Sequence, residues 1–166
     1  MRRIKVKELS WDNFNQYGSF ANMVNPDAYK IGGEPTEFFR DIVLLNLGQS
    51  GPVGLSTCRV LKRPLVITAI EYHDHTGEGM LPLDGDVILY FAPASPKAAM
   101  PLDEFEAFRV PMGTAVTIKP GVWHCGPFAD GKDCVNVLII LPERTYANDC
   151  VSFDLTEEQQ ITIEGC

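Results

Sequence analysis

The run LVITAIEYHDHTGEGMLPLDGDVILYFA, residues 65–92, decides the fold class of this chain. It contains three short apolar segments, Leu65–His73, Met80–Leu83 and Asp86–Ala92, which are separated by Gly, Pro and Asp residues. Short apolar segments between turn residues are typical of β-strands. Asp84-Gly85 is a strong signal for a tight hairpin. The run therefore predicts consecutive β-strands joined by short turns.

The same pattern continues on both sides of this run. Further candidate strands are Asp41–Leu47, Gly54–Leu61, Glu104–Val110, Ala115–Ile118, Cys134–Leu141 and Cys150–Leu155. Many short strands with Gly and Pro between them favour a sandwich or a closed barrel. The length of 166 residues is that of one domain. We therefore predict an all-β fold with a single domain over residues 1–166.

Only one helix is expected, near the start of the chain. Ser10 can cap it, Phe14 contributes to an apolar face, and Gly18 can end it. The stretch Ala21–Phe39 is rich in Gly, Pro, Asn and aromatic residues without a clear period, and we interpret it as a long loop that covers another part of the molecule. A last segment, Thr156–Gln160, is predicted to form one helical turn.

Charge and hydropathy exclude several classes of partner. The formal net charge is −8 and no basic stripe is present, so neither nucleic acid nor an anionic membrane surface is expected to bind. The strongest apolar stretch, Val137–Leu141, is five residues long, far shorter than the roughly 20 residues of a membrane helix. The start of the chain does not resemble a signal peptide. The five cysteines are odd in number and include no Cys-x-x-Cys, so free thiols in the cytoplasm are expected.

The three histidines of the chain predict a metal site. His73 and His75 lie two residues apart, so on a strand both imidazoles would point to one face. Glu78 follows beyond Gly77, and a turn at Pro120-Gly121 introduces His124. Three imidazoles and a carboxylate suit a divalent transition metal, which could be Mn, Fe, Co, Ni or Zn. The alternative is that His73 and His75 are solvated and that His124 is a packed core residue.

Together these segments resemble the two cupin motifs. The first motif is His-x-His, a Glu a few residues later, and a Gly after six more, which His73, His75, Glu78 and Gly85 match. The second contains Gly-x-x-His after a Pro, which residues 120–124 match. The resemblance implies a double-stranded β-helix, or jelly-roll barrel, with the metal bound inside.

A narrower resemblance connects the chain with the ureidoglycolate lyase (formerly ureidoglycolate hydrolase) family. Its pattern of an Arg, a Pro-Leu pair, a strand ending in His and a later Val-Trp-His is matched by Arg59, Pro64-Leu65, His73 and residues 122–124. Residues 81–87 and Asn148-Asp149-Cys150 match further segments of the family. The chain departs from the family where it has His75, Glu78, Ile118-Lys119 and Cys125.

This resemblance implies cleavage of ureidoglycolate, or of a related small hydroxy or ureido acid, to glyoxylate and urea, in the allantoin degradation of purine catabolism. Arg59 is then the candidate that grips the substrate carboxylate. The hydroxyl proton would pass to a hydroxide supplied by the metal or to Glu78. Lys119 is the candidate proton donor to the leaving urea nitrogen. For Arg59 and Lys119, a solvated surface charge is the alternative.

Two other functions fit the same residues. The set His73, His75, Glu78 and His124 is shared by cupin isomerases and dioxygenases, so a metal-dependent enzyme of another reaction type stays open. The third possible function is that of a non-catalytic cupin that binds a small ligand. The family resemblance also implies a homodimer, in which long β segments could extend a partner's sheet.

Overall fold

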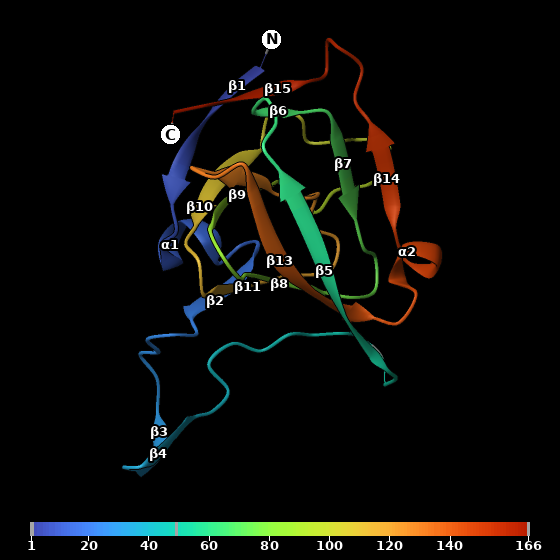
Figure 1. Cartoon of the computed structure of the whole chain (residues 1–166). Helices are drawn as coiled ribbons and strands as arrows, with labels where there is room; N and C mark the ends of the chain where they lie inside the picture. Colours follow the sequence, from blue (N-terminus) through green and yellow to red (C-terminus); the bar gives the residue numbers. More distant parts are fainter. Residues whose placement is uncertain (1, 49, 166) are drawn as a thin grey trace.

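The computed structural model describes residues 2–48 and 50–165 as two curled β-sheets that pack face to face (Figure 1). The first sheet has the strand order β12-β9-β10-β1-β15-β6. Its strands are β12 (Phe128–Asp130), β9 (Asp86–Phe91), β10 (Glu106–Val110), β1 (Arg2–Glu8), β15 (Ile161–Glu164) and β6 (Val66–Ile67). The second sheet has the order β2-β11-β8-β13-β5. Its strands are β2 (Gly18–Asn22), β11 (Thr114–Ile118), β8 (Glu78–Pro82), β13 (Cys134–Pro142) and β5 (Val53–Leu61).

Two smaller sheets and two short helices complete the described chain. Strand β7 (Ala69–Tyr72) pairs antiparallel with β14 (Val151–Asp154), and β3 (Lys30–Gly33) pairs with β4 (Thr36–Phe39). The helices are α1 (Trp11–Phe14) and α2 (Thr145–Asn148). The prediction of an all-β fold with one short N-terminal helix is thus confirmed for its main features, and α2 is an addition.

Strand β9 shows why the central run of the sequence is almost entirely apolar. Its alternate residues Val87, Leu89 and Phe91 pack into the core between the two large sheets. The residues between them, including Ile88 and Tyr90, pack into a second core under β7 and β14. Because successive side chains on a strand point to opposite faces, burial on both faces requires a continuous apolar run.

The structure corrects several predicted elements. Asp41–Leu47 forms no strand, and Ala21–Phe39 contains the hairpin of β3 and β4 rather than only a loop. Leu65–His73 is divided into β6 and β7. The helical turn expected at Thr156–Gln160 is present, since the N–H of Gln160 donates to the carbonyl of Thr156 at 3.1 Å. Four further strands were not predicted from the sequence: β1, β2, β12 and β15. Strand β1 is strongly charged, and it pairs in parallel with β10 and β15, which lie far along the chain.

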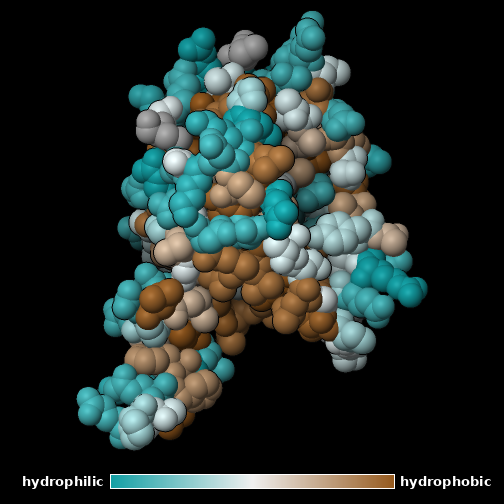
Figure 2. Space-filling view, in the orientation of Figure 1, coloured by the Kyte–Doolittle hydropathy of each residue, from teal (hydrophilic) through white to brown (hydrophobic). Residues whose placement is uncertain are grey.

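The hairpin of β3 and β4 projects from the barrel as an arm, here defined as residues 25–43 (Figure 1). Its apolar side chains Tyr29, Ile31 and Phe38 are exposed. Apolar residues also gather on the barrel surface next to the base of the arm (Figure 2). Exposed members on or near that base are Met23, Val24, Leu44, Val53 and Leu55. We call these five residues the underside patch.

The described cysteines and helices bear on two further expectations. Cys58, Cys125, Cys134 and Cys150 are free, as predicted, and Cys166 lies outside the described residues. In residues 2–48 and 50–165, neither helix has the length and apolar character needed to cross a membrane.

Candidate metal centre

Backbone pairing brings His73, Glu78 and His124 together from separate segments. Strand β7 ends at Tyr72, directly before His73, and β8 begins at Glu78. The turn between them is tight at Gly77, where a Cβ atom would lie 2.6 Å from the carbonyl oxygen of Ile118. His124 is held beside β7 because its N–H donates to the carbonyl of Glu71 at 2.8 Å and its carbonyl accepts from the Glu71 N–H at 2.6 Å.

The three side chains form a buried cluster around one carboxylate oxygen. Glu78 Oε2 lies 2.9 Å from His124 Nε2 and 3.2 Å from His73 Nε2. The two imidazole ring centres are 5.3 Å apart. The exposed fraction is 2% for each histidine and 4% for Glu78. Because the cluster is buried in a medium of low dielectric constant, its electrostatic interactions are stronger than they would be at the surface.

Two backbone carbonyls fix the proton positions on both imidazoles. His73 Nδ1 donates to the carbonyl of Asp149 at 2.6 Å, and His124 Nδ1 donates to the carbonyl of Val122 at 2.8 Å. A carbonyl oxygen only accepts hydrogen bonds, so both Nδ1 atoms carry a proton. The Nε2 atom of each neutral ring is then a lone pair directed at Glu78. Such lone pairs are the usual metal ligands of histidine.

In the protein without metal, the same contacts favour a charged cluster. Burial raises the pKa of Glu78, but hydrogen bonds from His124 and His73 outweigh burial and lower this pKa to about 2. Burial lowers the pKa of His73, whereas its bonds to Glu78 and to the Asp149 carbonyl raise it, and the net direction is upward. The lone pairs and the carboxylate therefore need a shared positive charge, which a proton or a cation can supply.

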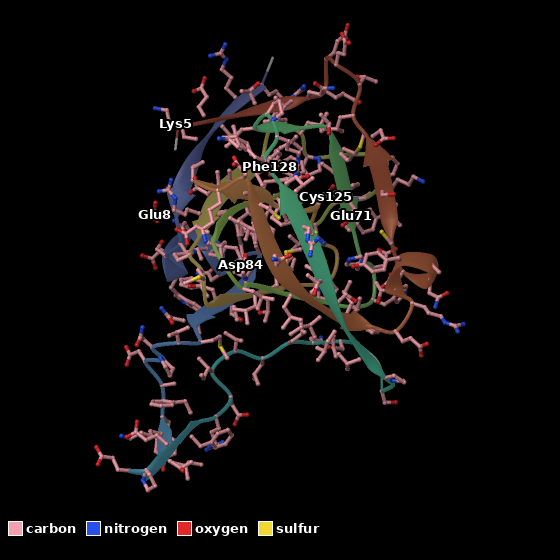
Figure 3. The ribbon with its side chains drawn as sticks, viewed as in Figure 1. Lys5, Glu8, Glu71, Asp84, Cys125 and Phe128 are labelled. Carbon is pink, nitrogen blue, oxygen red and sulfur yellow. The ribbon has the colours of Figure 1, made fainter. Side chains whose placement is uncertain are left out.

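Glu71 is a site residue that the sequence analysis did not identify. Ligand atoms of Glu71, His73 and His124 all lie within 4.8 Å of one another, so these three residues could hold a metal ion. Glu71 Oε2 also accepts a hydrogen bond from the Cys150 thiol at 3.5 Å. Figure 3 shows Glu71 near Cys125, and the charge of Glu71 acts on the Cys125 thiol. The sequence did contain a signal for Glu71, because it lies two residues before His73 and residues two apart on a strand share a face.

The structure does not bring His75 to this cluster. Its side chain is 86% exposed, and its Nδ1 lies 3.2 Å from a carboxylate oxygen of Asp149. The same carboxylate accepts the backbone N–H groups of Asp74, His75 and Thr76. This contact bends the chain directly after β7, so the two-residue period that predicted a shared face for His73 and His75 does not hold there.

Arg59 and Lys119 also lie away from the cluster. Arg59 is exposed on β5, where the neighbouring Cys58 packs toward the core, and its Nε donates to Asn136 Oδ1 at 3.3 Å. Lys119 is exposed, and its Nζ donates to the backbone carbonyl of Asn15 at 2.6 Å. Neither side chain contacts His73, Glu78 or His124 in the hydrogen bonds and ion pairs of the described chain.

The donor set fits a divalent transition metal. Imidazole nitrogens of His73 and His124 and a carboxylate oxygen of Glu71, with Glu78 beside them, are ligands of the kind that Mn, Fe, Co, Ni and Zn accept. The carbonyls bound to both Nδ1 atoms supply the outer hydrogen bonds that orient ligating histidines in proteins. The residues present thus fit such an ion, and His75 is not needed to hold it.

The first prediction separates the three histidines by their role in metal binding. His73→Ala and His124→Ala each remove an Nε2 ligand and are expected to weaken metal binding by more than about tenfold. His75→Ala changes an exposed side chain and is expected to alter the affinity by less than about threefold. The measurement is metal content by elemental analysis and metal titration of each variant. Loss of metal from His75→Ala alone would contradict this assignment.

The second prediction concerns the pH dependence of the metal-free protein. The lowered pKa of Glu78 stabilises the fold above the ordinary value of 4.5, and this contribution is lost as the pH falls toward about 2. The raised pKa of His73 stabilises the fold below the ordinary value of 6.5, and this contribution is lost as the pH rises above it. The stability difference between wild type and Glu78→Gln is therefore expected to be largest between pH 4.5 and 6.5.

Thermal unfolding in a chelator, from about pH 3 to about pH 8, measures this difference. A difference that stays constant across the whole range would show that the pKa values of Glu78 and His73 are not shifted in the directions described.

Comparisons with known proteins agree with this fold. A ureidoglycolate lyase from Stutzerimonas stutzeri is 22% identical over 167 residues, which cover 99% of this chain and 96% of that protein. Another, from Burkholderia cepacia, is 27% identical over 73% of this chain and 70% of its own length. A dTDP sugar isomerase from Desulfovibrio desulfuricans matches the structure with a TM-score of 0.50 and 15% identity, over 85% of this chain and 86% of its own. That likeness concerns the fold alone and supports the jelly roll. The family model for ureidoglycolate lyase matches residues 1–163, and the chain belongs to this family of lyases.

Proposed function

We propose that this chain is a metal-dependent lyase that cleaves ureidoglycolate, or a closely related small hydroxy or ureido acid, to glyoxylate and urea. The observation that carries the proposal is the convergence of Glu71, His73 and His124 within 4.8 Å, beside the buried Glu78. The activity is that of the family to which the chain belongs. Glu71 adds a carboxylate that can move a proton next to the ion.

The reaction requires one proton to move from oxygen to nitrogen. The O–H bond of the carbinol breaks, its electrons form the carbonyl of glyoxylate, and the C–N bond electrons leave with the urea nitrogen. A bound divalent metal would supply Lewis acidity that stabilises negative charge on the substrate oxygens. Glu71 accepts the hydroxyl proton and can return it to the departing nitrogen, so one carboxylate serves as base and then as acid.

Glu71 suits this role better than Glu78. The Oε2 atom of Glu78 is engaged by both imidazoles, and its pKa is lowered to about 2, which makes it a weak base. Glu71 is half-buried and contacts the Cys150 thiol, a neutral donor. The thiols nearby are poor nucleophiles, because burial and the charge of Glu71 raise the pKa of Cys125 to about 11. The chemistry therefore centres on carboxylate and imidazole groups.

The cellular setting follows from the same proposal. Turnover of ureidoglycolate belongs to allantoin degradation in purine catabolism, and we propose that the chain works in the cytoplasm. The odd number of cysteines and the free thiols of Cys58, Cys125, Cys134 and Cys150 support a reducing compartment.

The third prediction tests the activity directly. Incubation of the metal-loaded protein with ureidoglycolate is expected to release glyoxylate and urea in equal amounts. Glu71→Gln removes the proton acceptor while keeping the shape of the side chain, and is expected to lower kcat by about 10²- to 10⁴-fold. The control is Glu164→Gln, which changes a carboxylate that pairs with Arg3 on β1.

Three measurements distinguish the outcomes. Metal content of Glu71→Gln shows whether the loss of kcat comes from proton transfer or from loss of the ion. Full activity of Glu71→Gln would refute the role of Glu71. No release of glyoxylate by the wild-type protein with any of Mn, Fe, Co, Ni or Zn would refute the lyase activity itself and would favour another cupin reaction.

We also propose that the chain forms a homodimer through its arm. A two-stranded hairpin that stands alone is at best marginally stable in water. The arm exposes Tyr29, Ile31 and Phe38, and the underside patch provides apolar surface at its base (Figure 2). In a twofold dimer, each arm can cover the underside patch of the other copy, so that one pair of complementary surfaces is used twice.

The fourth prediction tests this contact. The wild-type protein is expected to have the mass of a dimer by sedimentation or light scattering. The double variant Ile31→Asp/Phe38→Asp places charges on the exposed arm and is expected to be a folded monomer, because charges are excluded from the centre of apolar interfaces. Leu83→Asp is the control, since Leu83 is exposed on the turn before β9. A wild-type monomer would refute the proposal.

A further inference from the structure

A cationic groove opens at the rim of the barrel beside the candidate metal centre. It has a volume of about 310 Å³ and is lined by residues 58–63 together with Gly126 and Pro127. Three of the described lining residues are cations, Arg59, Lys62 and Arg63, and none is a carboxylate. The chain as a whole carries a net charge of −8, so the positive charge of this groove contrasts with the negative charge of the whole molecule. Such a groove attracts small anions.

The guanidinium of Arg63 is held in place at this groove. Its Nη1 donates to the carbonyl of Pro127 at 2.8 Å, and its Nη2 donates to the carbonyl of Gly126 at 3.2 Å. The guanidinium carbon lies 4.0 Å from the ring centre of Phe128, which is labelled in Figure 3. These contacts use two of the five N–H donors of an arginine within the described chain. Arg63 thus presents a fixed charge with donors left for a ligand.

The groove adjoins the metal centre. Gly126 follows His124 by two residues, so the two positions are at most about 7 Å apart along the chain. Cys58 lines the groove and also packs against the core between the sheets. Burial raises the pKa of the Cys58 thiol, and the charges of Glu78 and Glu71 raise it further while that of Arg63 opposes them. The Cys58 thiol therefore lies within electrostatic range of Arg63 and of the Glu71 and Glu78 carboxylates.

We propose that Arg63 binds the carboxylate of the substrate and so selects small 2-hydroxy acids at this centre. This inference rests on the proposed function for the identity of the reacting bond. With its carboxylate on Arg63, a small acid can extend its hydroxyl-bearing carbon past Cys58 toward Glu71. The planar guanidinium suits a carboxylate because it can donate two parallel hydrogen bonds.

Arg63 replaces Arg59 in this role. Arg59 lines the same groove, but it alternates with Cys58 and Val60, which pack toward the core, and its Nε is engaged by Asn136. Arg63 instead follows the end of β5 and folds over the rim of the barrel, where the carbonyls of Gly126 and Pro127 hold it.

The fifth prediction uses glycolate as an anionic probe and glycolamide as its neutral counterpart, both titrated into the metal-loaded protein by calorimetry. Arg63→Met keeps the length of the side chain over Phe128 but removes the charge, and is expected to weaken glycolate binding by about tenfold to 100-fold. Glycolamide binding is expected to stay unchanged. Arg63→Lys keeps the charge but lacks the planar pair of N–H donors. Its glycolate affinity should lie between those of wild type and Arg63→Met.

Lys97→Met is the matched control, because Lys97 is a surface cation over the ring of Phe153, and its glycolate affinity should equal that of wild type. With ureidoglycolate as substrate, Arg63→Met is expected to raise KM by a similar factor with a smaller change in kcat. Equal glycolate affinity of wild type and Arg63→Met would overturn the inference. If neither wild type nor any variant cleaves ureidoglycolate but glycolate affinity still depends on Arg63, the lyase proposal fails while the assignment of Arg63 as the carboxylate-binding residue stands.

Discussion

The centre of this molecule depends on two hydrogen bonds from imidazole to backbone. The carbonyls of Asp149 and Val122 take the Nδ1 protons of His73 and His124, which leaves both Nε2 atoms directed at one oxygen of Glu78. Two lone pairs and a carboxylate in a buried space repel one another unless a positive charge lies among them. This arrangement is therefore stable only when a proton or a cation lies among the three groups, and the donor set matches a transition metal.

The barrel holds this unfavourable arrangement in place. Strand β9 is buried on both faces, and the core between the sheets supplies the stability that a buried ionic cluster does not supply by itself. The Asp149 carboxylate gathers three consecutive N–H groups after β7, so the turn that leads to Glu78 has little freedom. The reciprocal backbone bonds between Glu71 and His124 fix the other side of the centre.

Local sequence pattern was sufficient for the apolar strands and for the convergence of His73, Glu78 and His124, because the motifs carry the turns that position them. It was insufficient for His75, since the bend after Tyr72 comes from Asp149, a partner far along the chain. Arg59 lies on the outer face of β5 with its Nε on Asn136, and a short-range pattern does not tell which strand face points inward. Strand β1 was missed because its charged residues hide the alternation of Ile4 and Val6.

Nitrogen-15 NMR of the imidazole rings tests the central claim most directly, since the chain has only three histidines and His75→Gln removes the exposed one. The account predicts that His73 and His124 both carry their proton on Nδ1 in the zinc-loaded protein, with both Nε2 resonances shifted by the metal. In chelator, both rings should keep the Nδ1 proton. Either ring protonated on Nε2 alone, or Nε2 resonances that do not respond to zinc, would contradict the account.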